Sequence, residues 1–582
     1  MISFPPALIL IIGALLLIIL PRQTRPAAFL VFPALAFVWL IYLSPGDNLS
    51  ATFLNTALIM TRVDELSLAF GYIFVIITFI GGIYAYHNKN TTEQIATLLY
   101  AGSSLGVVFA GDLLTLVIFW EIMAVASAYL IWARGTSLAR GAGMRYLMMH
   151  LLGGSILIAG VLLHISQTGS AVFNPMEAGL SSYLILLAFC INAAVPPLHA
   201  WLTDAYPEGT ITGTVFLGAF TTKTAVYALA RGFAGWEMLI WVGIAMAIYG
   251  VVFVIPQNDL RRLLSYHIVS QVGYMIAAIG LGSALAVDGA TAHAINNILY
   301  KSLLLMAAGA VLFSTGKSTM SELGGLFKSL PGVFILYMIA AFAISGVPFF
   351  NGFVSKSLIT SAAAYEGIGL AVILLNLAAV GTFLSITLKL PYFTWFAEPH
   401  PVEVKKLPVG MYIAMAITGL ICLITGLFPQ ILFSILPYPI EYRVFDTGHI
   451  IETVQLLVFA TIGFCLLVKI SKPKAGVVLD FDWFYRRPGK LTYQALVVPV
   501  NKFFGLVENL SLRAVHYLTA VSINPVYYLY SKVRWNNGFS AEKKSGLLPV
   551  YDPDKQRYTM EPIVIIVVVF IIGLLGWGLI RL

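Results

Sequence analysis

Long apolar runs separated by short polar segments recur along most of this 582-residue chain. Each run is long enough to cross the hydrocarbon core of a bilayer as a helix, for which about 20 residues suffice. Strands of a membrane barrel would instead show alternating segments of only about 10 residues. The pattern therefore predicts an all-α, polytopic membrane protein with about sixteen transmembrane helices. The predicted spans cover residues 5–20, 27–43, 66–86, 94–110, 112–132, 143–166, 181–204, 211–233, 237–255, 263–283, 289–314, 330–364, 367–396, 409–433, 450–470 and 562–580.

Two of the predicted spans contain a helix break. The seventh carries Pro196-Pro197, and the twelfth carries the sequence SGVP at 345–348. Proline removes a backbone donor and clashes with the preceding turn, and the freed carbonyls are tolerated at membrane depth only inside protein or beside a water-filled cavity. Spans 4–8 and 9–13 can thus be superposed as two five-helix repeats, each with a broken helix in fourth place. Because five is an odd number, the repeats are predicted to be inverted, as in many transporters.

Basic residues are concentrated in the loops that follow odd-numbered spans, for example Arg134, Arg140 and Lys405. The loops after even-numbered spans hold little more than Arg62 and Arg231. By the positive-inside rule the odd-numbered loops are cytoplasmic. We therefore expect a multi-pass protein of the cell (inner) membrane with both termini on the outer side.

The character of the chain changes after Ile470, where it becomes polar and basic. Between residues 507 and 521 the apolar side chains fall on one helical face, which predicts an amphipathic helix lying along the membrane, against a partner, or over this protein's own cytoplasmic surface. The predicted organisation is N-terminal transmembrane helices (1–93), a first five-helix repeat (94–236), a second, inverted repeat (237–397), additional transmembrane helices (398–470), a cytoplasmic or amphipathic extension (471–561) and a C-terminal anchor (562–582).

Composition supports the membrane assignment and narrows the function. Hydrophobic residues make up 59% of the chain and charged residues 10%, whereas soluble domains carry about 25% charged residues. The net charge of +8 comes from loops between spans, so we expect no nucleic-acid partner. Cys190, Cys422 and Cys465 form no cluster, and the chain lacks a dinucleotide fingerprint. We therefore expect no cofactor, no metal and no redox centre of its own, which indicates a transporter subunit rather than an enzyme.

A few ionisable residues lie inside the apolar runs. Such groups are costly in a membrane and are usually functional, with a partner elsewhere. Charge at one buried site changes protonation at the next, so a line of them suits proton or cation relay. A structural ion pair is the alternative for Glu121, and snorkelling to the membrane surface is the alternative for Lys356 and Lys389. The candidates are Glu121, Lys223, Lys301, Lys356, Lys389 and His293.

Six successive motifs carry a family resemblance: FWEIMAVASAYLI, PPLHAWLTDAYPE, TTKTAVYALAR, NDLRRLLSYHIVSQVGYM, HAINNILYKSLLLMAAG and SGVPFFNGFVSK. They resemble the proton-translocating antiporter family, which contains the antiporter-like subunits of respiratory complex I, the large subunits of Mrp-type cation/proton antiporters and their relatives in membrane-bound hydrogenases. The resemblance covers roughly residues 60–430 and is greatest to the branch of the Mrp D subunits. It implies other membrane subunits as partners, with protons and Na⁺ as candidate ions.

The resemblance also implies roles for single residues along the membrane midplane. Two family positions are changed: Asn192 stands where a lysine commonly pairs with the glutamate, and Asn297 replaces a histidine. Asparagine can hydrogen-bond Glu121 but cannot hold a proton, so either Lys223 serves as the partner of Glu121 or the first half-channel is weakened. The matched relay residues are Glu121 on the fifth span, Lys223 on the eighth, His293 and Lys301 on the eleventh and Lys356 on the twelfth.

Three functions remain open from the sequence. The first is a proton or monovalent cation/proton translocating subunit of a multisubunit complex. The second is the pumping subunit of a redox-driven complex, such as a membrane-bound hydrogenase or a complex I relative, in which other chains carry the electrons. The third is a scaffold subunit without ion traffic, for which Asn192 is the best support.

Overall fold

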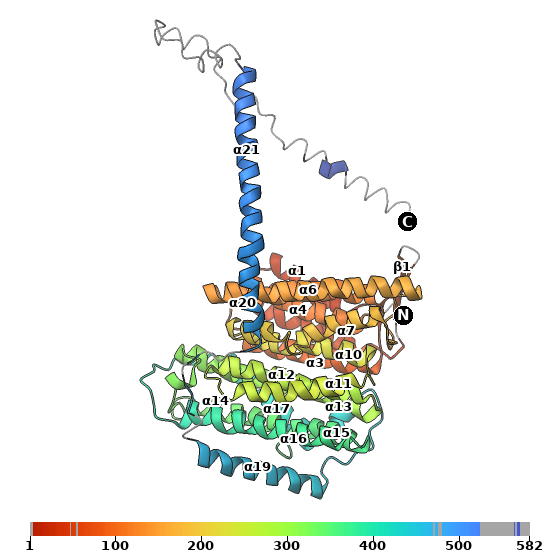
Figure 1. The fold of residues 1–582 in the computed structure, drawn as a ribbon. Helices are drawn as coiled ribbons and strands as arrows, with labels where there is room; N and C mark the ends of the chain where they lie inside the picture. Colours follow the sequence, from red (N-terminus) through yellow and green to blue (C-terminus); the bar gives the residue numbers. More distant parts are fainter. Residues whose placement is uncertain are drawn as a thin grey trace. The chain divides into compact units, whose positions relative to one another are not determined.

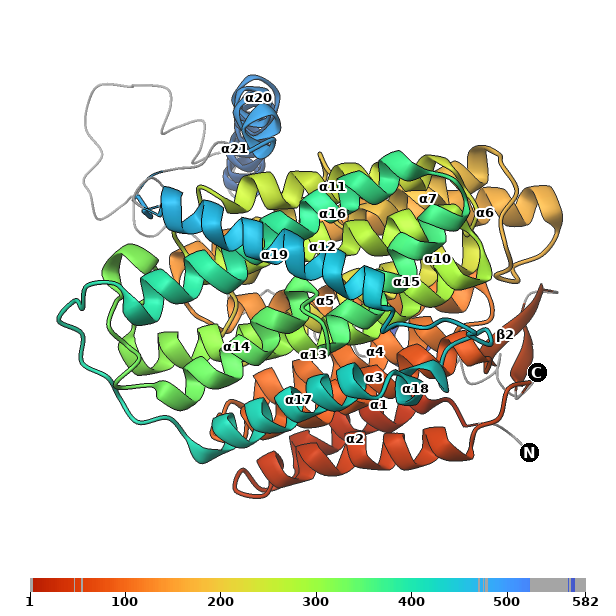
Figure 2. The same ribbon diagram turned by 90° about the horizontal axis from the view of Figure 1, so that it is seen from below.

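The computed structural model describes residues 4–46, 48–53, 56–468, 472–474, 476, 480–523, 564 and 567–570. Its contacts divide the chain into two units, Met1–Asp482 and Trp483–Leu582, and helices dominate both (Figures 1 and 2). The helices in the first 315 residues are α1 (Pro6–Ile19), α2 (Arg25–Tyr42), α3 (Glu65–Tyr84), α4 (Thr91–Phe109), α5 (Leu113–Trp132), α6 (Ser137–Thr168), α7 (Leu180–Asn192), α8 (Ala200–Ala205), η1 (Tyr206–Glu208), α9 (Gly213–Ala219), α10 (Thr221–Gly232), α11 (Met238–Val254), α12 (Leu260–Leu281) and α13 (Ala284–Thr315). The later ones are η2 (Met320–Glu322), α14 (Pro331–Ser345), α15 (Asn351–Tyr365), α16 (Gly369–Thr382), the π-helices η3 (Phe383–Lys389) and η4 (Tyr392–Phe396), α17 (Val409–Leu427), α18 (Pro429–Phe433), α19 (Thr447–Leu467), α20 (Asp482–Thr492), η5 (Tyr493–Val497) and α21 (Val498–Ile523).

Within the described residues, ten helices are long and apolar enough to cross a membrane, and four shorter apolar helices accompany them. The multi-pass helical architecture is therefore confirmed, while the number of sixteen spans stays a prediction. One of the ten candidates is residues 487–519, inside the segment that the sequence predicts to be an extension. The predicted last span, 562–580, and residues 524–561 lie outside the described residues, apart from Val564 and 567–570.

The all-α prediction misses a small β-hairpin between α2 and α3. Strands β1 (Asn48–Phe53) and β2 (Thr56–Arg62) pair in antiparallel fashion, with Asn48 opposite Arg62 and Phe53 opposite Thr56. The hairpin contains several β-branched and aromatic residues, which favour strands. Being short and placed between two apolar runs, it left no mark on a hydropathy pattern.

Both predicted helix breaks are confirmed. The first separates α7 from α8, and the second separates α14 from α15. Each break holds one non-glycine residue in the left-handed region, Ala194 with φ 59° and Phe349 with φ 72°, a conformation that surrounding structure must impose. A third break, at Phe220 between α9 and α10, was not predicted.

The same capping arrangement appears at the start of α5 and of α12. Asp112 accepts a hydrogen bond from the Thr115 N–H at 2.8 Å, and Asp259 accepts one from the Arg262 N–H at 2.8 Å. Such caps satisfy orphan N–H groups at a helix start. Asp112 also forms a bridge with Val172.

Asp259 forms the matching bridge with Thr319. Both bridges follow a 32-residue helix, α6 or α13, that ends at a left-handed glycine, Gly169 (φ 70°) or Gly316 (φ 69°). The aspartates, the glycines and the bridging residues are separated by the same number of positions in the sequence. The two halves of the helical body are thus framed by the same local geometry.

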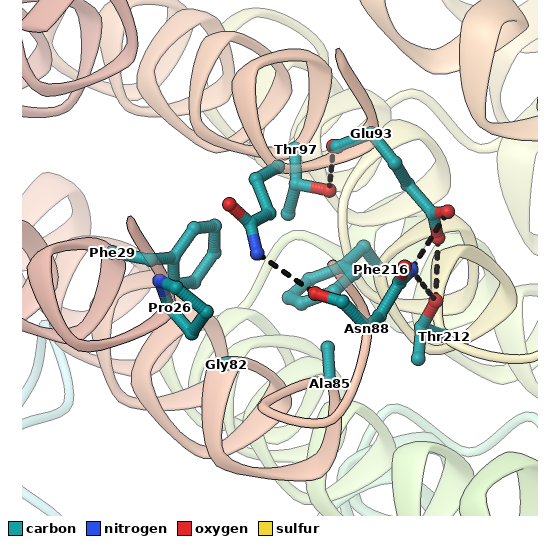
Figure 3. Close-up of a pocket in the computed structure, with 10 residues that line it drawn as sticks. Pro26, Phe29, Gly82, Ala85, Asn88, Glu93, Thr97, Thr212 and Phe216 are labelled. Carbon is teal, nitrogen blue, oxygen red and sulfur yellow. Dashed lines mark hydrogen bonds between the residues drawn. The ribbon is translucent and has the colours of Figure 1, made fainter. Parts of the chain in front are cut away.

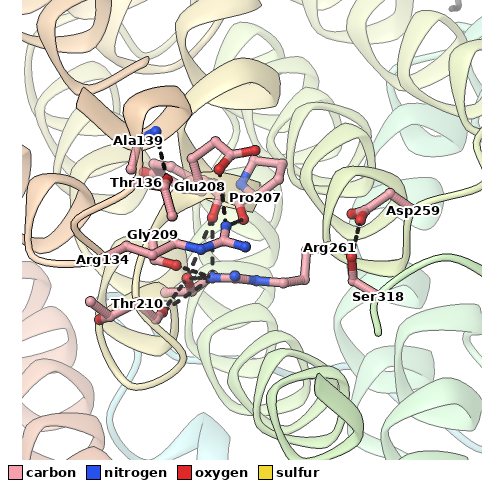
Figure 4. Close-up of polar contacts among 12 residues, drawn as sticks. Arg134, Thr136, Ala139, Pro207, Glu208, Gly209, Thr210, Asp259, Arg261 and Ser318 are labelled. Carbon is pink, nitrogen blue, oxygen red and sulfur yellow. Dashed lines mark hydrogen bonds and ion pairs between the residues drawn. The ribbon is translucent and has the colours of Figure 1, made fainter. Parts of the chain in front are cut away.

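Two arginines, the buried Arg261 and the partly exposed Arg134, hold the loops at one end of these helices (Figure 4). Arg261 donates through Nη2 to the carbonyl oxygens of Gly209 at 2.8 Å and Thr210 at 3.1 Å. Arg134 forms an ion pair with Glu208 at 3.0 Å. Arg261 therefore anchors the loop at residues 209–210 to α12.

A second anchor joins the segment after α19 to the helical body. The Asp480 carboxylate accepts hydrogen bonds from His199 Nε2 at 3.1 Å, from the Tyr266 hydroxyl at 2.5 Å and from the Tyr249 hydroxyl. Burial opposes ionisation, but these hydrogen bonds and the His199 ring outweigh it and lower the pKa of Asp480 to about 2. Asp480 thereby connects the start of α8 with α11 and α12.

Candidate proton-relay site

Glu121 lies in the middle of α5 and packs against α6. An ideal Cβ at position 154 would lie 1.6 Å from Glu121 Oε1, so Gly154 provides the space that this carboxylate occupies. Oε1 is buried and has no hydrogen-bond partner in the part of the chain that the structure describes. Since buried carboxylates normally find partners, this one is available to a proton or to a water molecule.

Asn192 lies at the end of α7, next to the adjacent glycine of α6. Its Oδ1 is 3.0 Å from His150 Nδ1 and 3.6 Å from an ideal Cβ at Gly153. A hydrogen bond between Asn192 and Glu121 is not among the described contacts, and Asn192 pairs with His150 instead. His150 is buried and belongs to this cluster.

A chain of hydroxyl groups runs from this cluster towards Lys223. The Tyr146 ring lies 4.2 Å from the His150 ring, and its hydroxyl is 2.8 Å from Ser127 Oγ and 3.3 Å from Thr221 Oγ1. Thr221 Oγ1 is in turn 2.6 Å from the Tyr100 hydroxyl. Hydroxyl groups both donate and accept hydrogen bonds, so such a chain can conduct a proton.

Lys223 lies just after the unpredicted break between α9 and α10. Its Nζ donates to the carbonyl oxygen of Gly218 at 2.9 Å. No ion pair among the described residues involves Glu121. If Lys223 is the partner of Glu121, the two therefore communicate through the intervening polar side chains rather than by direct contact.

The second group of predicted residues surrounds α13. Lys301 Nζ donates to the Leu264 carbonyl oxygen at 3.0 Å, and His293 Nδ1 is 2.9 Å from Ser355 Oγ. Asn297 donates to the Tyr300 hydroxyl at 3.1 Å. These side chains are fully buried, so they can exchange protons only with one another or with internal water.

Lys356 follows the second break and repeats the arrangement of Lys223. Its Nζ donates to the Ile344 carbonyl oxygen, one residue before the end of α14, at 2.7 Å, and lies 5.0 Å from the centre of the Tyr274 ring. Lys223 interacts electrostatically with Lys301 and with His293, and so does Lys356 with His293. These buried ionisable residues therefore lie near enough to one another to interact electrostatically.

Lys389, in the π-helix η3, is placed differently. Its Nζ donates to the carbonyl oxygens of Gln257 at 3.1 Å and of Ile255, which follow the end of α11. A cation at a helix C-terminus is favoured by the helix dipole. The contacts give Lys389 a capping role, and its side chain is too buried to be snorkelling.

The partners of the buried residue Glu93 were not predicted from the sequence. Glu93, at the start of α4, accepts hydrogen bonds from Thr210 at 2.6 Å, from Asn88 at 2.8 Å and from Thr212, beside a cavity of about 20 Å³ (Figure 3). Its threonine partners are far away in the sequence, so a polar residue at the start of a span did not indicate which residues it would contact.

No group of three or more histidine, cysteine, aspartate or glutamate side chains within the described ranges is arranged to hold a metal.

Comparison with known proteins shows which family this chain resembles. Residues 110–385 match the family described as NADH:quinone oxidoreductase/Mrp antiporter, TM. The family resemblance is thereby confirmed. The chain is also 29% identical over 327 residues to the D subunit of the Na(+)/H(+) antiporter of Alkalihalophilus pseudofirmus, and the match covers 52% of this chain and 66% of that protein.

Two further likenesses extend this comparison. The A subunit of the Na(+)/H(+) antiporter of the same organism is 29% identical over 440 residues, covering 66% of this chain and 54% of that protein. The chain thus spans about half the length of this larger relative. The solved membrane-bound sulfane sulfur reductase, an archaeal respiratory membrane complex, contains a chain similar in fold, with a TM-score of 0.68 at 22% identity, covering 93% of this chain and 97% of that one.

Proposed function

We propose that this chain translocates protons, in exchange for Na⁺ or another monovalent cation, as one membrane subunit of a hetero-oligomeric complex. The relatives named as antiporter subunits support the class of transport. The observation that carries the proposal is the placement of Lys223 and Lys356, each bonded to a carbonyl oxygen at a helix break. Neither ammonium group is held by a carboxylate among the described contacts, so its proton is free to pass to the next group in the line.

The proposed relay begins at Glu121 and passes through Lys223 and Lys301 to Lys356. His293, which interacts electrostatically with Lys223 and Lys356, and the hydrogen-bonded hydroxyls of Tyr146 and Thr221 complete the proposed relay. The supporting residues are Asn192, Asn297 and Lys389, which position backbone and side chains rather than hold the moving proton.

The proposal includes two inverted five-helix repeats at 94–236 and 237–397 within sixteen spans, with the additional helices, extension and anchor at the boundaries given above. Support comes from the equivalent caps and bridges at Asp112 and Asp259 and from the break in fourth place in both repeats. Cytoplasmic odd-numbered loops and outward termini complete the proposed topology in the inner membrane.

The test uses everted membrane vesicles that carry the native complex, with proton flux followed by a pH-sensitive dye. Lys223→Ala and Lys356→Ala should each lower flux at least tenfold. The exposed loop residue Lys317, which pairs with Glu322, provides the control Lys317→Ala, expected to be neutral. If both buried substitutions leave flux intact, the chain is a scaffold and the relay is wrong.

A redox-driven pump is the second candidate, because the structural likeness to the sulfane sulfur reductase chain extends over 93% of this chain. The relay would be the same, and only the driving force would differ. Purification of the native complex separates the two: electron-carrying subunits favour the redox pump, and antiporter subunits alone favour exchange.

A further inference from the structure

The relay described above ends at Lys356, and a small cavity continues from it. The cavity has a volume of about 50 Å³ and is enclosed by α15, α16 and α19. A buried water needs roughly 10–15 Å³ of such space, so the cavity has room for several. Its polar lining consists of Ser345, Lys356, Ser357, Thr360, Asn376, His449 and Thr453.

His449 stands at the far side of this cavity, in the first turn of α19. Its Nε2 is 2.8 Å from the Ser357 hydroxyl, and its ring packs on Phe353 with 5.1 Å between ring centres. Ser357 directly follows Lys356 in α15, so histidine and lysine face the same enclosed space. Figure 2 shows α19 running alongside α15 and α16.

Two carboxylates lie beside His449 on its outward side. Asp446 caps α19 three residues earlier, and Glu452 lies three residues later; both are exposed and both act electrostatically on the imidazole. Among the described residues that line the cavity, Lys356 is the only lysine or arginine. His449 therefore lies between a buried cation and a pair of exposed acids.

We propose that His449 is the proton-exchange residue that connects Lys356 with the solution at the end of the protein where α19 begins. Resting on the proposed function, the step moves one proton from the Lys356 ammonium through cavity water to the neutral imidazole, which leaves a neutral amine and an imidazolium. The imidazolium then loses its other N–H proton towards Asp446, Glu452 or solvent, which leaves the other neutral tautomer of the ring. A water-mediated proton shift between the two ring nitrogens restores the starting tautomer of His449, and the relay reprotonates Lys356. The reverse sequence loads Lys356 from outside.

Imidazole is suited to this task because its charge changes near neutral pH and it has two exchangeable nitrogens. Ser357 fixes the orientation of the ring through Nε2. Nδ1 then faces away from Ser357. One nitrogen can thus serve the cavity while the other serves the exposed acids.

The experiment compares His449→Gln, His449→Ala and the control His164→Gln in vesicles carrying the native complex. Glutamine can still bond Ser357 but cannot titrate, so His449→Gln should lower proton flux at least fivefold and remove one titration from its pH profile. His449→Ala should behave likewise and regain flux when imidazole is added at tens of millimolar. His164, a partly exposed histidine of α6 remote in sequence from the relay motifs, should give wild-type flux when changed to glutamine.

Three results would overturn the proposal. Full flux in His449→Gln, with flux lost in Lys356→Ala, would show that the relay works without this exit. Lost flux in His449→Ala without imidazole rescue, together with full flux in His449→Gln, would give His449 a structural role only. Full flux in Lys356→Ala as well would defeat the relay itself, and the exit would fall with it.

Discussion

The long helices α6 and α13 hold the same place in the two proposed repeats, yet their middle turns differ. The corresponding positions, counted from the first residue of each helix, are Tyr146 and His293, His150 and Asn297, and Gly154 and Lys301. In α6, Gly154 leaves space for the carboxylate of Glu121, which belongs to α5, whereas the corresponding position of α13 is Lys301. The same helical framework therefore hosts an acidic group in the first proposed repeat and a basic group in the second, and the side chains differ at all three of these positions.

The largest expected effect tests the glycine of this comparison. Gly154→Ala would place a methyl group where Glu121 Oε1 lies, 1.6 Å from the ideal Cβ, so the carboxylate must swing away. We expect at least a tenfold loss of proton flux without loss of the folded complex, because alanine is favoured over glycine within helices.

Gly153→Ala is the matched control for that substitution. Its Cβ would meet the Ile191 side chain at 3.3 Å and Asn192 Oδ1 at 3.6 Å, which small shifts can accommodate. Flux within twofold of wild type is expected. Equal losses in both variants would mean that helix packing, not the position of Glu121, is responsible.

The next effect concerns Asn192, which stands where a lysine is expected from the family resemblance. If Lys223 is the partner of Glu121, Asn192→Lys supplies a nearer cation and should reduce the dependence on Lys223. Lys223→Ala alone should lower proton flux at least tenfold. The double variant Asn192→Lys/Lys223→Ala should have at least threefold more flux than Lys223→Ala. Additive losses in a double-mutant cycle would contradict the coupling.

A smaller effect is expected at the caps, where the two repeats are alike. Asp112→Ala and Asp259→Ala each remove the acceptor of a helix-start N–H group. Each should lower the free energy of unfolding by about 1 kcal/mol, measured as a decrease in the melting temperature of the detergent-solubilised complex. Thermal shifts that differ severalfold between the two would show that the frameworks are not equivalent.

The most local effect concerns Asp480, which contacts residues of both proposed repeats. Because the pKa of Asp480 is lowered to about 2 from an ordinary 3.8, its contribution of about 2 kcal/mol is fully present above pH 4 and is lost as the pH falls towards 2. At pH 7 Asp480→Asn should accelerate hydrogen exchange at the Phe481 N–H, which now donates to Asp480 Oδ1 at 2.6 Å. Unchanged exchange would argue against the anchor.

The sequence predicted those features that local chemistry determines. The breaks after α7 and α14 follow from proline, and the buried ionisable residues follow from their rarity in apolar runs. The break at Phe220 carries no proline, and Gly218 alone did not distinguish it from a continuous helix.

Partners could not be predicted in the same way. Three features depend on which faces of distant helices meet: the role of Gly154, the pairing of Asn192 with His150 and the burial of Glu93. Hydropathy indicates which residues lie within the membrane, but not which helix faces contact each other. His449 was missed for this reason too: it begins a span, and only the packing of α19 on α15 reveals its neighbour Ser357.

The length of α6 and α13 has a consequence for the lipid environment. A helix of 32 residues is about 48 Å long, whereas the hydrocarbon core of a bilayer is about 30 Å thick. Both helices must therefore tilt or extend into the headgroup layers, at a cost of fractions of a kcal/mol per ångström of mismatch. Because the most apolar stretch of α6 is 39% buried inside the protein and that of α13 is 83% buried, a change in bilayer thickness acts mainly on α6.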